Sequence, residues 1–125
     1  MRFKKVLIAV DSEPVAVRAA ETGVDLAQAL GAEVAFVHVV GSERDAKKVA
    51  TAIRRRLSPQ SSALEFIQVG GSSKEIIKAA KAWGSDLIVI GSHGRSGVQR
   101  VVFGSVAEAV MRNAPCPVVV VRAKE

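Results

Sequence analysis

Short runs of branched apolar residues alternate along the chain with longer segments in which apolar residues recur every three or four positions. The runs have the length of buried strands, and the longer segments have the period of amphipathic helices. The pattern predicts strands over residues 6–10, 34–40, 64–69, 87–90 and 118–121. Between them it predicts helices with apolar faces spanning 16–30, 46–57, 76–83 and 106–113. The face of the first helix includes Ala27 and Leu30, and that of the last includes Val106, Ala109 and Val110.

Strict alternation of strand and helix predicts an α/β fold, with a parallel sheet and helices on both faces. Right-handed crossovers are the reason that the helices cover both faces. The nearly continuous branched content of strands 6–10, 87–90 and 118–121 fits burial on both sides of the sheet. The chain has 125 residues and shows no internal repeat or linker, so residues 1–125 are predicted to form a single domain.

A glycine-rich stretch lies between the strand at 87–90 and the helix that follows it. Its glycines and serine follow the spacing Gly-x2-Gly-x9-Gly-Ser, at Gly91, Gly94, Gly104 and Ser105. Glycine lets the backbone turn with positive φ and lets a ligand approach closely. The free N–H groups at a helix start favour an anion there. The stretch therefore predicts a site for a nucleotide or another phosphate compound.

This spacing, together with the segment 106–122 that follows it, resembles the branch of the universal stress protein family that carries an ATP-binding motif. The runs 5–12 and 35–40 are similar to that family as well. The resemblance implies an open, Rossmann-like five-stranded sheet of order 3-2-1-4-5, with strands 6–10 and 87–90 adjacent at its centre. It also implies a stress-response or signalling module in which ATP occupancy acts as a switch, with little or slow hydrolysis.

In an open parallel sheet, ligands bind beyond the carboxyl ends of the strands, where the winding direction reverses. With strands 6–10 and 87–90 as neighbours, that crevice lies between Asp11 and Gly91. The Asp11 carboxylate could accept from a ribose hydroxyl or the adenine amino group, or help to hold a metal through water. Alternatively, it only shapes the turn before Ser12. Ser105 could bind phosphate or act only as a helix N-cap.

By the resemblance, Val10 and Val39 would flank the base. His93 could touch phosphate or ribose, or only face water, and Arg95 is a candidate partner for phosphate charge. The full set of predicted nucleotide-binding residues is Val10, Asp11, Ser12, Val39, Gly91, His93, Gly94, Arg95, Gly104, Ser105 and Val106.

Several motifs of catalysis and metal binding are missing from the sequence. It contains no P-loop lysine motif, no dinucleotide fingerprint after the first strand, no Cys-x2-Cys pair and no His-Glu-x2-His. No catalytic or metal-ligating residue is therefore predicted, and Mg²⁺ or Mn²⁺ would come with ATP, held mainly by its phosphates. The alternatives are a slow ATPase, a phospho- or nucleotidyl-transfer enzyme, or a scaffold for cyclic AMP or another adenine ligand.

The remaining expectations concern surroundings and partners. The net charge is +6, but the chain has no tyrosine, and scarce aromatics disfavour nucleic acid as a partner. The short first apolar run and the single Cys116 favour the cytoplasm, and no apolar run is long enough to span a membrane. His38 and Cys116 are expected to be packed core residues. Strand 118–121 is expected to form a homodimer through its edge, unless the C-terminal residues cover it.

Overall fold

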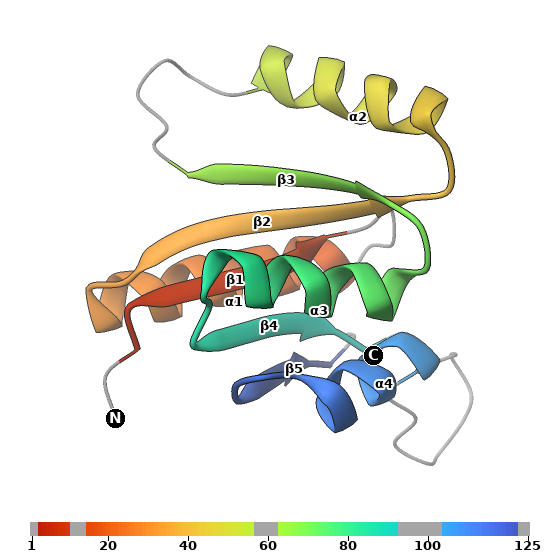
Figure 1. Ribbon diagram of the computed structural model, residues 1–125. Helices are drawn as coiled ribbons and strands as arrows, with labels where there is room; N and C mark the ends of the chain where they lie inside the picture. The colour runs from red at the N-terminus through yellow and green to blue at the C-terminus, as the bar shows by residue number, and fades with distance from the viewer. Residues whose placement is uncertain (1–2, 11–14, 57–62, 93–103, 123–125) are drawn as a thin grey trace.

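The computed structural model describes residues 3–10, 15–56, 63–92 and 104–122 (Figure 1). The elements follow the predicted order: β1 Lys5–Val10, α1 Val15–Leu30, β2 Glu33–Val40, α2 Glu43–Arg56, β3 Leu64–Val69, α3 Ser72–Trp83, β4 Leu87–Gly91, α4 Ser105–Asn113 and β5 Val118–Val121. The ends of both strands and helices differ from the prediction. The helices begin one to four residues earlier, at Val15, Glu43, Ser72 and Ser105, and α2 ends one residue earlier, at Arg56. β1 and β2 begin one residue earlier, and β4 extends one residue further to include Gly91.

All five strands are parallel and form one sheet of order β3-β2-β1-β4-β5, which confirms the order implied by the resemblance. β1 lies at the centre, where Ile8 pairs with Phe36 of β2 and with Val89 of β4. Helix α1 covers one face of the sheet, and α3 and α4 cover the other (Figure 1). Among the described helices, none is long and apolar enough to cross a membrane.

Alternation along the strands divides the core into two layers. Leu7 and Ala9 of β1 face α3 and α4, whereas Val6 and Ile8 face α1. Because β1 and β4 have helices on both faces, every residue of β4 is buried, as the continuous apolar run predicted.

Two predicted helix faces need correction. In α1 the buried side chains include Ala19 and Ala27, whereas Leu30, which was expected to be apolar core, is 44% exposed. Leu30 is the last helical residue, and Gly31, with φ of 66°, turns the chain toward β2 before Leu30 can reach the sheet. In α4 the fully buried residues are Ala107 and Val110, so the buried stripe is rotated from the predicted one that included Ala109.

A single side chain ties the amino end of β1 to the start of β4. The carboxylate of Asp86 accepts hydrogen bonds from the backbone N–H groups of Lys4 at 2.9 Å and Lys5 at 3.0 Å. The Lys5 ammonium donates to the carbonyl of Trp83 at 3.1 Å and lies 5.4 Å from the centre of its ring. These contacts set the register of the two central strands at the end of the sheet opposite the carboxyl ends.

Helix α1 approaches the sheet closely at Gly23. A Cβ atom at this position would lie 2.5 Å from Cδ1 and 2.6 Å from Cγ1 of Ile8, which is fully buried. A packed side chain that makes contacts on all sides cannot move aside without disturbing its neighbours. The absence of a side chain at Gly23 therefore sets the distance between α1 and the central strand.

We predict that Gly23→Ala destabilises the protein even though alanine is the better helix former. Overpacking against Ile8 should exceed the gain in helix propensity and leave a net loss of about 1 kcal/mol in the free energy of unfolding. Urea unfolding measures this value. Gly41→Ala is the matched control, because a Cβ there meets nothing within 4 Å and φ is not positive.

Adding Ile8→Val, which removes Cδ1, should make the combined loss smaller than the sum of the two separate losses. A Gly23→Ala variant as stable as the wild type would contradict the close approach seen here.

Cys116 lies between α4 and β5 and packs against the apolar cluster on the α3 and α4 side. Burial raises the pKa of its thiol, a hydrogen bond with Ser85 acts in the opposite direction, and the negative charge of Asp86 raises it further. The sulfur lies 3.9 Å from the Ser85 hydroxyl oxygen. Cys116 is thus a packed, weakly acidic thiol, as expected.

Because the thiolate is the reactive form, we predict that Cys116 of the folded protein reacts with a disulfide reagent at pH 8 more slowly than an unfolded thiol. The difference in rate should be about tenfold or more. Unfolding in guanidinium should restore the rate of a short cysteine peptide. A folded protein that reacts as fast as the unfolded one would show that burial does not protect this thiol.

Candidate functional site

The two central strands separate at their carboxyl ends. β1 pairs with β4 only as far as Ile8 and Val89. β1 nevertheless stays paired with β2 up to Val10 and His38, and β4 stays paired with β5 up to Gly91 and Val121. The chain also reverses its winding direction between these strands, because β2 and β3 lie on one side of β1 and β4 and β5 lie on the other. The sheet therefore opens where ligands bind in folds of this kind.

Helix α4 begins at the same edge of the sheet. It follows β4 in the chain and runs back along the sheet toward the start of β5 (Figure 1). The first bond within the helix runs from the N–H of Glu108 to the carbonyl of Gly104 at 3.0 Å. The N–H groups of Ser105, Val106 and Ala107 therefore precede the helical hydrogen-bond ladder. No side chain of the described residues caps this helix start.

Gly104 is the N-cap residue of α4, and the alternative that Ser105 is the N-cap is wrong. Gly104 has φ of 90° and ψ of 154°, a conformation that residues with a Cβ rarely adopt. Ser105 is instead the first helical residue, and its side chain is exposed. The positive φ therefore explains why this position is a glycine, and the Ser105 hydroxyl does not cap the helix.

The start of α4 is held firmly by its buried face. Ala107 and Val110 are fully buried, and Val106 packs against the same apolar cluster. Val39, the penultimate residue of β2, also packs against this cluster. Val39 and Val106 thus belong to one apolar layer, on the α3 and α4 side of the sheet.

Val10 lies on the other side of the sheet from Val39. Ala9 belongs to the layer that faces α3 and α4, so alternation directs the next residue, Val10, toward the α1 side. Val10 is half-buried and pairs with His38. Val10 and Val39 thus lie on opposite faces of the sheet, and their predicted positions beside the base stay predictions.

The residues at the end of β4, Gly91 and Ser92, are held in place by burial and by a backbone hydrogen bond to β5. Gly91 is buried as the last residue of β4, and the N–H of Ser92 donates to the carbonyl of Val121 at 2.8 Å. Ser92 is only 4% exposed. Ser92 was not among the predicted site residues, although its place next to Gly91 at a strand end could have indicated an anchoring role.

Five of the predicted site residues lie outside the described part of the chain, namely Asp11, Ser12, His93, Gly94 and Arg95. Their roles stay predictions. Within the described residues, no three His, Cys, Asp or Glu side chains come together as metal ligands.

His38 is mostly buried, but it is not packed only against apolar groups as expected. Its Nε2 lies 3.4 Å from Oε1 of Glu65 on the neighbouring strand β3, and the two side chains are 15% and 18% exposed. Glu65 was not among the predicted functional residues. The sequence could have indicated a role for Glu65, because a carboxylate within an apolar strand needs a polar or charged partner.

The same arrangement of strands and helices occurs in proteins of known family. The model of the universal stress protein family matches residues 2–68 and 42–122. Universal stress protein MJ0531 of Methanocaldococcus jannaschii is 29% identical over 96% of this chain and 82% of its own length. The structure of universal stress protein UspA from Lactobacillus plantarum has a TM-score of 0.80 at 27% identity, covering 98% of this chain and 99% of its own.

Two further structures of the same fold hold adenine nucleotides. A universal stress protein in complex with cAMP has a TM-score of 0.74 at 21% identity, covering 97% of this chain and 98% of its own. A universal stress protein from Archaeoglobus fulgidus in complex with dAMP has a TM-score of 0.70 at 24% identity, covering 97% and 99%. The two family matches together span almost the whole chain, from residue 2 to residue 122, and this protein belongs to the universal stress protein family.

Proposed function

We propose that this protein is an adenine-nucleotide-binding module that takes ATP into the crevice between the carboxyl ends of β1 and β4. The observation that carries the proposal is the separation of these two strands beyond Ile8 and Val89, at the edge where α4 begins. The uncapped N–H groups of a helix start and the positive end of its dipole attract phosphate. The Gly104 conformation keeps a side chain away from that approach.

In this proposal the N–H groups of Ser105 and Val106 and the Ser105 hydroxyl donate to phosphate oxygens. Gly104 leaves room for the phosphates, and Val39 and Val106 provide an apolar wall for the base. Mg²⁺ or Mn²⁺ would be held mainly by the phosphates themselves.

The other predicted site residues keep their proposed roles around this centre. Asp11 would accept from the ribose or the adenine amino group, with Val10 and Ser12 as its neighbours in the chain. Gly91 and Gly94 would let the loop pass close to the ligand. His93 and Arg95 would contact phosphate or ribose, where a guanidinium can form paired hydrogen bonds with phosphate oxygens.

The complexes with cAMP and dAMP show that other proteins of this fold hold an adenine ring and a phosphate. These two proteins are 21% and 24% identical to this chain, which supports a shared fold but not a shared ligand. The proposal of ATP therefore rests on the spacing of Gly91, Gly94 and Gly104 before Ser105. We propose that occupancy of the site, rather than rapid hydrolysis, is the signal in a stress response. The proposed compartment is the cytoplasm.

We also propose a homodimer formed through β5. This strand is at one end of the sheet order, and among the described strands it pairs only with β4. Three of its four valines are half-buried, so a second copy of the strand would cover both apolar surface and backbone groups.

Mg-ATP should stabilise the folded protein, because the crevice exists only when β1, β4 and α4 are assembled. At about 100 times its dissociation constant, ATP should add ~2.7 kcal/mol to the free energy of unfolding. Thermal unfolding with ATP, ADP, cyclic AMP and GTP, each with Mg²⁺, measures this effect and ranks the ligands. No change in melting temperature with any adenine nucleotide would rule out the proposed function. Phosphate release faster than about 1 s⁻¹ would instead indicate an enzyme.

Ser105→Ala should weaken ATP binding without destabilising the free protein. The exposed hydroxyl does not cap the helix. Its loss should therefore change the unfolding free energy by less than ~0.5 kcal/mol. Losing a hydrogen bond to a charged phosphate should raise the dissociation constant about tenfold, as measured by calorimetry.

Ser72→Ala is the matched control for this variant. Ser72 is likewise the exposed first residue of a helix whose N-cap is a glycine without a side-chain cap. It follows the edge strand β3 rather than β4, so its loss should leave ATP affinity unchanged. Equal effects of the two variants would argue against a specific role for Ser105.

A further inference from the structure

The strand at the other end of the sheet, β3, has an edge that no other described strand covers. Among the described strands it pairs only with β2. The N–H of Gly70 donates to the carbonyl of Val40 at 3.0 Å, so the amide just after β3 points toward β2. Directions alternate along a strand, and therefore the N–H and C=O groups of Ile67 and Val69 point toward the free edge.

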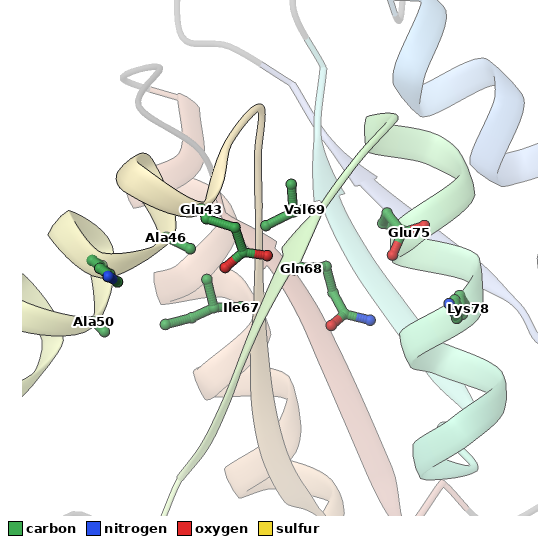
Figure 2. Close-up of a pocket in the computed structure, with 9 residues that line it drawn as sticks. Glu43, Ala46, Ala50, Ile67, Gln68, Val69, Glu75 and Lys78 are labelled. Carbon is green, nitrogen blue, oxygen red and sulfur yellow. The ribbon is translucent and has the colours of Figure 1, made fainter.

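This edge lies at the bottom of an open groove of about 480 Å³. Residues of α2 line one side and residues of α3 line the other, with β3 between them (Figure 2). On the α2 side, the small side chains of Ala46 and Ala50 lie across from Ile67 and leave room above the strand. On the other side, Gln68 extends toward Lys78 of α3. An extended chain placed here could direct alternate side chains toward the two helices.

The groove carries charges in a definite order along β3. Glu43 and Glu75 lie in the first turns of α2 and α3, near the carboxyl end of the strand. Lys47 and Lys78 follow about one helical turn later on each wall. No ion pair within 4.0 Å joins either lysine to an acidic side chain of the described residues. The acidic and basic pairs are therefore about two strand residues apart, since a strand rises ~3.3 Å per residue.

We propose that the free edge of β3 binds an extended peptide segment of a partner protein as an additional strand. On the wall that they face, the segment has a basic residue beside the acidic side chain, Glu43 of α2 or Glu75 of α3, and two positions away an acidic residue beside the lysine, Lys47 of α2 or Lys78 of α3. Backbone hydrogen bonds to Ile67 and Val69 supply the pairing, as in other cases of strand addition. The alternating order of charges on the walls sets which segments fit.

A single segment fits this surface better than the sheet edge of a second copy. Figure 1 shows α2 beyond β3, on the side away from β2. Helix α2 lines one side of the groove along this edge, and a second copy paired there would bring its own α2 into the same space. A lone strand needs only the width of the groove.

The probe is a fluorescent peptide, acetyl-TVKVEVT-amide, added to the full chain with and without Mg-ATP. We expect saturable binding in both cases, because the groove does not include the crevice between β1 and β4. The same peptide with glutamine at both charged positions should bind about tenfold more weakly, since each lost ion pair removes a charge-assisted contact. Binding should also weaken as salt rises.

The double variant Lys47→Gln with Lys78→Gln should likewise lose about tenfold in affinity for the probe. Its matched control, Lys48→Gln with Lys81→Gln, removes the same net charge from the same two helices but outside the groove lining. The control should retain the wild-type dissociation constant. Equal losses of affinity in both double variants would show that only the net charge of the protein matters for binding, and would overturn the proposal.

Backbone pairing is tested by two N-methylated probes that carry methyl groups on opposite sets of alternate amides. Only one set faces β3, so one probe should lose about tenfold or more in affinity and the other should bind like the parent. Equal binding of both, or no saturable binding of the parent at millimolar protein, would overturn strand addition. Light scattering that shows a dimer dissociated by Val69→Pro would also overturn it, in favour of a second copy.

Discussion

The pairing of β1 with β4 is the constraint on which the rest of the structure depends. It joins the two halves of the sheet, it is buried beneath α1 on one face and beneath α3 and α4 on the other, and it lasts only as far as Ile8 and Val89. At one end the Asp86 carboxylate ties the strands together through backbone amides. At the other end the strands part, and the same pairing that stabilises the core ends where the candidate site opens.

The close approach of α1 serves this central pairing. With no side chain at Gly23, the helix packs directly on Ile8, in the middle of the strand that pairs on both sides. A larger residue would push α1 outward and loosen the layer over both halves of the sheet. The stability of the central pairing therefore depends on the close packing of the Gly23 backbone against the Ile8 side chain.

Two helices of this protein start in nearly the same way, yet only one of these two starts lies where β1 and β4 separate. Gly71-Ser72 begins α3 and Gly104-Ser105 begins α4, and neither glycine has a side-chain cap. The dipole and the free amides are chemically alike. What differs is the neighbouring strand: α3 follows the edge strand β3, and α4 follows β4 at the point where the winding reverses.

The five strands, the four helices and the glycine-rich stretch could be predicted from the amino-acid pattern, because hydrophobic period and glycine conformation are local properties. The sequence also led, through a family resemblance, to the strand order. Tertiary structure decided which side of the sheet each residue faces: it separated Val10 from Val39, exposed Leu30 and brought Glu65 to His38. It also decided that β1 and β4 part after three pairs and that β3 lies in a charged groove. Such features depend on contacts between segments far apart in the chain, and a local pattern carries no information about them.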